Sequence, residues 1–361
     1  MDKQKDNFTN WTHTSYEKIP ENQNNWKLTE SDYRAFKKTA WVVTEKIHGA
    51  NFCIITDGSE VRFAKRKELL QPDEDFFGHQ SLQIKLAQQV KDIFQILQAE
   101  RPQTFIVSVY GELFGGEYPH SDVAAVPNVQ AVQTGIYYSP KIEFCAFDIA
   151  VEENSRAAKR DYIDYEKALK IFQQVGMLRA ESLFTGKYEQ ALGQNIEFDS
   201  TIPALLGLPK LLFSNKAEGI VIKPVKSIYI DTPKGRIRPI IKRKITEFSE
   251  DSRFHQAEKW ANQNPATATN YFSDEKWLKE AMLALVTENR LINTMSKVGR
   301  ISGKDTKALE KVFQLFVNDV LEAFNESYES ILKTLPEKSQ QSLIEQVEQE
   351  SKTLINNYFK K

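Results

Sequence analysis

The sequence has little of several features that mark common protein classes. Only two cysteines, Cys53 and Cys145, occur among 361 residues, and both lie within apolar runs. We therefore expect buried free thiols in a reducing cytoplasm rather than disulfides. Five scattered histidines and the lack of a Cys-x-x-Cys pair argue against a structural zinc site. No apolar run approaches the roughly 20 residues that span a bilayer, and the first ten residues lack the apolar core of a signal peptide. The expectation is a cytoplasmic protein without a membrane partner.

Basic and acidic residues balance over the chain as a whole, but one stretch has a clear excess of basic residues. The 48 Lys and Arg residues balance 49 Asp and Glu residues, which argues against a uniformly basic surface. Between residues 210 and 244, however, ten basic residues stand against two acidic ones. This stretch is the predicted phosphate-binding surface, since clustered Lys and Arg attract phosphate groups.

The patterning divides the chain into two parts. Its length favours two domains. Up to about residue 248, β-branched runs predict strands at 41–46, 51–57, 61–66, 104–114, 141–151, 219–225 and 236–245, with helices at 81–98 and 164–175. Beyond that point the periodicity is helical, at 274–290, 305–333 and 337–358. The sequence therefore predicts an α+β protein, with a mixed domain over 1–248 and an all-α domain over 249–361.

Charged and aromatic residues recur at the edges of the predicted strands. Lys46 lies at the end of the first predicted strand, and Gly49 behind it allows backbone or ligand to approach closely. A surface lysine before a turn is the simpler alternative for this segment alone. The other sets, in chain order, are Lys65-Arg66, Tyr110-Gly111-Glu112, Phe147-Asp148, Glu218 to Lys223, and Lys242-Arg243-Lys244.

In their order and spacing these segments resemble the six nucleotidyl-transfer motifs of covalent nucleotidyltransferases, which include ligases and mRNA capping enzymes. EKIHGANF (residues 45–52) is similar to the signature of the RNA ligase 2 family, whereas DNA ligases and capping enzymes usually show Lys-x-Asp-Gly. Residues 296–324 resemble that family's helical C-terminal domain. The resemblance implies an N-terminal nucleotidyltransferase domain with ATP-grasp-like antiparallel sheets and helices.

The resemblance implies a three-step reaction that starts at Lys46. Its amine attacks the α-phosphate of ATP, AMP passes from the lysine to a 5′-phosphate, and a 3′-hydroxyl then displaces AMP. An attacking amine must be neutral, whereas free lysine has a pKa of about 10.4, so nearby cations are needed to disfavour the ammonium form. Lys242, Lys244 and Mg²⁺ or Mn²⁺ are the implied cations, and ATP is the implied AMP donor.

The same resemblance assigns roles around the nucleotide. Phe147 is implied to stack on adenine, Glu112 to contact the ribose, and Arg66 to contact ribose or phosphate. The implied nucleotide contacts also include Glu45, Ile47 and Asn51, and the implied contacts with nucleic acid are His48, Asn51, Arg66 and Arg243.

Three further residues are implied near the reacting phosphate. Glu218 and Asp148 are the implied metal ligands, since carboxylates suit Mg²⁺. Lys223 is implied to reach a phosphate, although strict alternation along a strand places it on the face opposite to Glu218.

We therefore expect an ATP-dependent RNA ligase that seals 3′-OH/5′-phosphate nicks in duplex RNA or RNA–DNA hybrid and acts as a monomer. One alternative is a DNA nick ligase, against which Lys-x-His-Gly and the helical tail argue, and a capping guanylyltransferase is a weaker one. A third alternative is a catalytically inactive RNA-binding relative, against which five intact residues argue: Lys46, Glu112, Glu218, Lys242 and Lys244. After residue 247 there are 15 basic and 17 acidic residues, so the helical part is no general basic clamp. Its candidates for RNA contact are Lys297, Arg300, Lys304 and Lys307.

Overall fold

The computed structural model describes residues 13–153, 160–233, 235–248, 275–327 and 331–360. In these residues the strands form three sheets with antiparallel pairing throughout. The first has the order β11-β8-β1-β7, the second β3-β2-β4-β5-β6, and β9 and β10 form a hairpin. The bounds are β1 Trp41–Glu45, β2 Ala50–Thr56, β3 Val61–Lys65, β4 Thr104–Glu117, β5 Ser139–Glu153, β6 Asp161–Tyr162, β7 Ser182–Gly186, β8 Gly219–Pro224, β9 Ile230–Thr232, β10 Gly235–Ile237 and β11 Ile241–Lys244.

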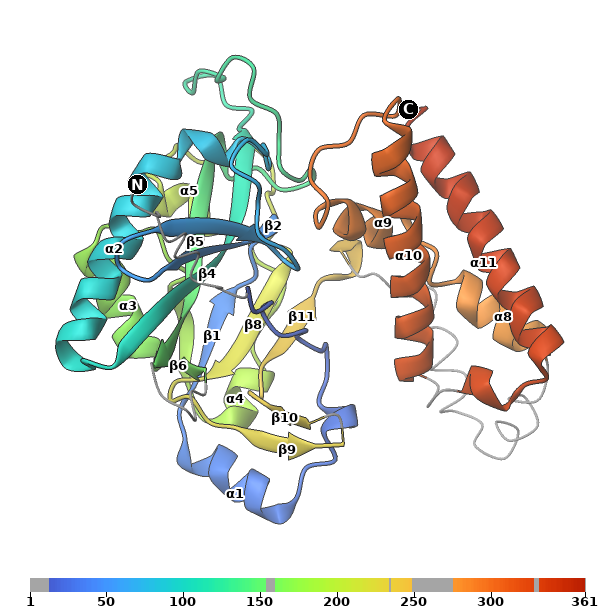
Figure 1. Cartoon of the computed structure of the whole chain (residues 1–361), viewed down its shortest axis with the longest axis horizontal. Helices are drawn as coiled ribbons and strands as arrows, with labels where there is room; N and C mark the ends of the chain where they lie inside the picture. The colour runs from blue at the N-terminus through green and yellow to red at the C-terminus, as the bar shows by residue number, and fades with distance from the viewer. Residues whose placement is uncertain (1–12, 154–159, 234, 249–274, 328–330, 361) are drawn as a thin grey trace, which may run out of the picture.

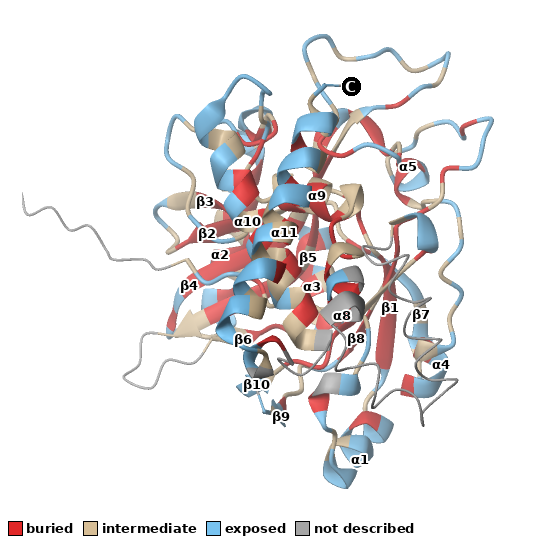
Figure 2. Cartoon of the chain, turned by 90° about the vertical axis from the view of Figure 1, so that its right-hand side faces the viewer, coloured by how far each residue is buried: buried red, intermediate tan, exposed pale blue. Residues whose placement is uncertain are grey.

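Helices cover the outer faces of both larger sheets (Figure 1). On the five-stranded sheet lie α2 (Gln83–Glu100) and α3 (Tyr165–Gln174), whose buried residues recur at helical spacing and join the largest apolar core. On the four-stranded sheet, α1 (Glu30–Lys38) and α4 (Tyr188–Leu192) pack Phe36 and Tyr188 against Trp41. The short helix α5 (Ile202–Leu205) follows. Figure 2 shows β1 buried along its length, as both of its faces are covered.

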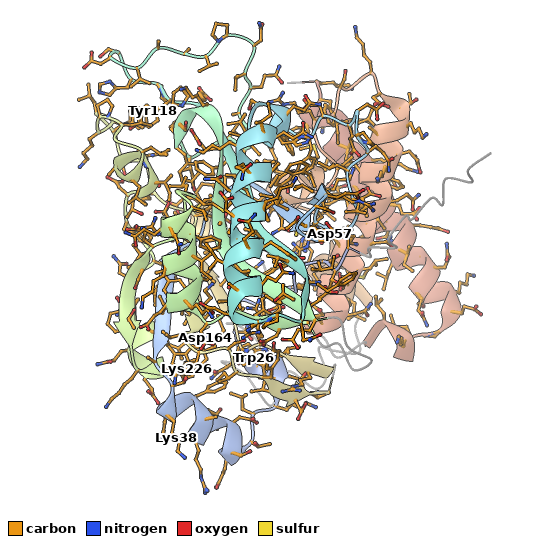
Figure 3. All side chains as sticks on the ribbon, turned by 60° about the vertical axis from the view of Figure 1, so that its left-hand side comes forward. Trp26, Lys38, Asp57, Tyr118, Asp164 and Lys226 are labelled. Atoms are coloured by element: carbon orange, nitrogen blue, oxygen red, sulfur yellow. The ribbon has the colours of Figure 1, made fainter. Side chains whose placement is uncertain are left out.

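The two ends of the sheets are bounded by different loops (Figure 3). Tyr118 lies just beyond β4 at one end, where a long connection leads to β5. Asp164 and Lys226 lie near each other at the opposite end, where the carboxylate of Asp164 accepts a hydrogen bond from the backbone of Ser227 (2.7 Å). Lys46 lies between β1 and β2, which belong to different sheets.

One predicted strand is interrupted in the structure. The run 236–245 was expected to be continuous, but β10 ends at Ile237 and β11 begins at Ile241. Pro239 has no N–H to donate to a strand ladder, and the side chain of Arg238 is buried in the protein interior. The break therefore separates a surface hairpin from the strand that carries Lys242 and Lys244.

The C-terminal part is helical and has its own apolar core. Its helices are α8 (Glu275–Leu283), α9 (Glu288–Met295), α10 (Thr306–Ser327) and α11 (Glu337–Tyr358). The single helix expected over 274–290 is wrong: Thr287 has extended backbone and caps the start of α9. The predicted boundary after residue 248 adjoins residues 249–274, which lie outside the described residues, so it stays a prediction.

Polar contacts join the helical part to loops of the N-terminal part. Lys18 pairs with Glu326 (3.0 Å), Lys311 pairs with Glu68 (2.8 Å), and Arg300 donates to the backbone oxygen of Gln130 (2.9 Å). Each of the helices described is too short or too polar to span a bilayer. Cys53 and Cys145 are buried free thiols, as expected.

Candidate active site

The segment after β1 carries Lys46 out of one sheet and into the next. The backbone N–H of Lys46 still donates to Gly219 of β8 (2.9 Å), and the chain then turns before β2. At Gly49 an added Cβ would lie 2.1 Å from the carbonyl oxygen of Leu113, so only glycine fits there. The predicted lysine at a strand end, with a glycine required behind it, is confirmed as a backbone arrangement.

Lys46, His48 and Lys244 meet at the carboxylate of Glu218, although they are far apart in the sequence. The Nζ of Lys46 lies 2.7 Å from Oε2 and that of Lys244 3.1 Å from Oε1, while Nδ1 of His48 lies 3.2 Å from Oε2. Burial alone would raise the pKa of Glu218, but the ammonium groups of Lys46 and Lys244 outweigh it and hold this pKa well below its usual range. The site therefore contains an ionised carboxylate, that of Glu218, in contact with the side chains of Lys46 and Lys244.

Strand β11 places its basic residues on two faces. Lys244 pairs with Gly219 and Lys242 with Val221, so alternation sets both lysines on one face and Arg243 on the other. The guanidinium of Arg243 donates to the backbone oxygen of Leu192 (2.6 Å), at the end of α4. The nucleic-acid contact predicted for Arg243 stays a prediction.

Glu112 of β4 is a second carboxylate of the site. Asn51 lies directly opposite it on β2, and the two side chains hydrogen-bond. The pKa of Glu112 is raised to about 7, chiefly by burial. The positive charges of Lys46 and Arg66 lower this pKa, whereas the negative charge of Glu218 raises it. Without a nucleotide, this carboxyl group is thus partly protonated near neutral pH.

Phe147 is the extra residue of a β-bulge. Tyr110 pairs with Asp148 and Gly111 pairs with Ala146, which leaves Phe147 without an opposite residue on β4. The Nζ of Lys223 donates to its carbonyl oxygen (2.7 Å), and its half-buried ring lies edge-on to Tyr16 with centroids 4.9 Å apart. Because a bulge changes the direction of a side chain, the ring of Phe147 departs from the direction that a regular strand position would give it.

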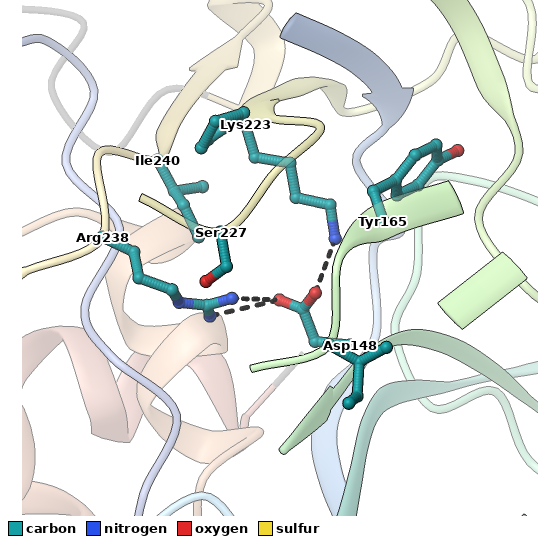
Figure 4. A pocket seen from close by; sticks show the side chains of 8 residues that line it. Asp148, Tyr165, Lys223, Ser227, Arg238 and Ile240 are labelled. Atoms are coloured by element: carbon teal, nitrogen blue, oxygen red, sulfur yellow. Dashed lines mark hydrogen bonds and ion pairs between the residues drawn. The ribbon is translucent and has the colours of Figure 1, made fainter. Parts of the chain in front are cut away.

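Asp148 belongs to a separate buried cluster (Figure 4). Its carboxylate accepts from Lys223 (2.8 Å), from both terminal nitrogens of Arg238 (3.1 and 3.2 Å) and from the hydroxyl of Tyr16. Burial would raise the pKa of Asp148, but Lys223 and Arg238 hold it below its usual value. Lys223 is on the face that strict alternation gives, and β8 contains no bulge among its pairings with β1 and β11.

The structure thus divides the predicted phosphate-side residues between two clusters. Glu218 contacts Lys46, Lys244 and His48, whereas Asp148 contacts Lys223, Arg238 and Tyr16. Within the described ranges no three His, Cys, Asp or Glu side chains are grouped to hold a metal. The metal roles of Glu218 and Asp148 and the phosphate contact of Lys223 stay predictions.

Other side chains near Lys46 are packed inside the protein. The carboxylate of Glu45 accepts from Ser200 Oγ (2.6 Å) and from the backbone and hydroxyl of Thr201 (both 2.7 Å), and Ile47 is buried in an apolar cluster. The nucleotide contacts predicted for Glu45 and Ile47 remain untested.

The basic stretch 210–244 is not one exposed surface, contrary to our expectation. Lys216 pairs with Glu247 (3.0 Å), Lys223 and Arg238 with Asp148, and Lys244 with Glu218. Much of this charge neutralises carboxylates within the protein. Sequence reasoning counted Arg238 only as charge and missed Tyr16; the Arg-Pro step at 238–239 is the available signal for a residue leaving the strand.

Comparisons with known proteins identify the family of the chain. A model of the RNA ligase family matches residues 39–244, and one described as T4 RNA ligase 2 C-terminal matches residues 270–353. The mitochondrial RNA-editing ligase 2 of Trypanosoma brucei brucei is 32% identical over 359 residues, which cover 89% of this chain and 85% of the relative. The mitochondrial RNA-editing ligase 1 of that organism is 28% identical over 366 residues, covering 89% and 77%.

A solved structure of Naegleria gruberi RNA ligase with PPi aligns with 13% identity and a TM-score of 0.39. The alignment covers 65% of this chain and 57% of that chain, less than two thirds of its length. The family match over more than half of the chain and the 32% identity over most of it show that the protein belongs to the RNA ligase 2 family.

Proposed function

We propose that the protein is an ATP-dependent RNA ligase that seals 3′-OH/5′-phosphate nicks in duplex RNA or RNA–DNA hybrid, as a cytoplasmic monomer. The observation that carries this proposal is the meeting of Lys46 and Lys244 at Glu218, next to Glu112. The family match and the RNA-editing ligases among the relatives support RNA as the substrate class.

Lys46 is the member of the Glu218 cluster that a nucleotide can reach. Its side chain is 20% exposed, whereas the side chains of Lys244 and Glu218 are 3% and 2% exposed. The low pKa of Glu218 makes it a poor proton acceptor. Glu218 therefore holds the two amines in place, while Lys46 supplies the nucleophile and Lys244 supplies positive charge at the phosphates.

The residues present fit a nucleotide and a divalent metal. Two amines and Arg66 can neutralise phosphate charge, Glu112 offers a carboxyl group to the ribose, and the half-buried ring of Phe147 offers a face to adenine. Mg²⁺ is commonly held by one or two carboxylates together with substrate phosphates, and Glu218 is the ionised carboxylate at this site. When bound, the metal would stabilise negative charge on the phosphates.

A sealing assay with ATP and Mg²⁺ tests the proposal. Two nicked duplexes differ only in whether the strand that ends in the 3′-hydroxyl is RNA or DNA at the nick, and Lys46→Ala serves as the inactive control. We expect sealing of the RNA-ended nick and little sealing of the DNA-ended one, because recognition of A-form RNA uses its shape and 2′-hydroxyls.

Two other outcomes contradict it. Equal or better sealing of the DNA-ended nick indicates a DNA ligase. If the wild type takes up no AMP at all, the protein is an inactive RNA-binding relative.

A further inference from the structure

The long connection between β4 and β5 contacts the turn that carries Lys46. The backbone N–H of His48 donates to the hydroxyl oxygen of Tyr138 (3.0 Å), and the side-chain amide of Gln133 donates to the carbonyl oxygen of Gly49 (3.3 Å). Both residues belong to residues 118–138, which join the two strands. The turn is therefore held from outside by side chains as well as by its own strands.

Tyr138 is placed as a fixed support. It is 1% exposed, its ring packs edge-on against Phe114 with centroids 5.1 Å apart, and it shares an apolar cluster with Ile47. Burial raises the pKa of Tyr138 well above its usual value, and the negative charge of Glu45 raises it further. The hydroxyl thus stays neutral over the pH range of any ligation assay.

The N–H of His48 needs such an acceptor. Strand β1 ends at Glu45 and β2 begins at Ala50, so His48 lies outside both ladders. It is 7% exposed, and a buried N–H without an acceptor is unfavourable by about 1–3 kcal/mol. The tyrosine hydroxyl satisfies this donor two residues after the attacking lysine.

We propose that Tyr138 is a positioning residue for adenylylation: its hydroxyl fixes the backbone of the Lys46–Gly49 turn and so the direction in which the Nζ of Lys46 is presented. This inference rests on the proposed function. It concerns formation of the lysyl-AMP bond, in which the amine of Lys46 displaces pyrophosphate from ATP, and not the closing step, in which a 3′-hydroxyl displaces AMP from an adenylylated end.

The test compares Tyr138→Phe with Tyr118→Phe in the full chain. Tyr118 lies in the same connection and is 6% exposed, but its hydroxyl donates to the backbone of Pro209 rather than to the lysine turn. The readouts are the rate of lysyl-AMP formation over a range of ATP concentrations, and sealing of a nick whose 5′-end is already adenylylated.

We expect Tyr138→Phe to lower the limiting rate of lysyl-AMP formation about tenfold or more, because small misplacements of reacting groups have large effects on rate. The ATP concentration at half-saturation should change by less than about twofold and sealing of the adenylylated nick by less than about threefold, since neither depends on attack by Lys46. Tyr118→Phe should resemble the wild type. Gln133→Met, which removes the second contact with the turn, should change the limiting rate in the same direction as Tyr138→Phe.

Three results overturn the inference while leaving the proposed function intact: an unchanged limiting rate in Tyr138→Phe, an equal loss in Tyr118→Phe, or an equal loss in lysyl-AMP formation and in sealing of the adenylylated nick. A wild type that forms no lysyl-AMP overturns both the proposed function and this inference. If Tyr138→Phe does not fold, Gln133→Met decides by the same criteria.

Discussion

Glu218 and Asp148 are two buried carboxylates with closely similar surroundings and different consequences. Each accepts from two cationic side chains and one further group, and they are 1% and 3% exposed. The side chain of Lys46 beside Glu218 is 20% exposed, whereas those of Lys223 and Arg238 beside Asp148 are 7% and 6% exposed. The lysine of one cluster is partly exposed, whereas the cations of the other are almost fully buried beside a small cavity (Figure 4); we call them the open and the closed cluster. The two clusters thus differ in the access to their amines, although their charge patterns are alike.

The closed cluster joins segments from both sheets. Asp148 comes from β5, Lys223 from β8, and Arg238 from the break between β10 and β11, where its guanidinium lies 3.3 Å from the ring centroid of Tyr162. Arg238 also donates to Glu17 (2.6 Å) in the N-terminal segment. Removing Asp148 would leave Lys223 without its carboxylate and Arg238 with Glu17 as its remaining anion.

The largest expected effect comes from the open cluster. Lys46→Ala removes the nucleophile and should lower self-adenylylation at least about a thousandfold, measured with labelled ATP in a single turnover. The free energy of unfolding should change little, because Glu218 keeps Lys244 and His48 as partners. Lys216→Ala, which breaks an exposed pair with Glu247, is the matched control and should adenylylate normally. A labelled Lys46→Ala protein would refute the assignment.

The closed cluster should respond in the opposite way, through stability. Asp148→Asn leaves the buried Lys223 without its carboxylate and Arg238 with Glu17 alone, and we expect it to lower the free energy of unfolding by about 3–5 kcal/mol in urea titrations. Glu322→Gln, at an exposed contact with Lys18, should cost less than about 1 kcal/mol. If the two substitutions had equal effects, Asp148 would not be the centre of a closed cluster.

Glu112 provides a smaller and pH-dependent comparison, since its pKa is raised where those of Glu218 and Asp148 are lowered. With a folded-state pKa of about 7 against 4.5 in the unfolded chain, the folded state binds the proton more tightly, so this stability is present below pH 4.5 and is lost as the pH rises through 7. Glu112→Gln should therefore stabilise the nucleotide-free protein by about 3 kcal/mol at pH 8 and hardly at all at pH 4, at the expense of adenylylation. Urea titrations at the two pH values measure this difference, and a pH-independent effect would contradict the raised pKa.

The sequence was sufficient for the parts of the site that depend on local pattern. Lys46 follows a β-branched run and precedes a glycine, and Lys242 and Lys244 share a face because side chains alternate along a strand. These features need only neighbouring residues. The resemblance to a family gave the order of the segments, which local pattern alone could not.

The remainder depends on contacts between distant segments. Nothing near Arg238 in the sequence shows that its charge is used by Asp148, and nothing near Glu45 shows that Ser200 and Thr201 surround its carboxylate. Tyr138 is similarly an ordinary strand-edge tyrosine until the turn at His48 is placed against it.

The bulge at Phe147 shifts the alternation of side chains along β5 by one residue. Before it, Cys145 lies opposite Glu112 and shares the face of that carboxylate; after it, Asp148 lies opposite Tyr110 and shares the same face, although the two residues are three positions apart. A regular strand would instead turn Asp148 toward the helix-covered core that holds Phe144 and Ala146. Deletion of Phe147 would therefore make the strand regular, with Ala146 still opposite Gly111 and Asp148 still opposite Tyr110, and would remove the bulged ring without exchanging the two faces.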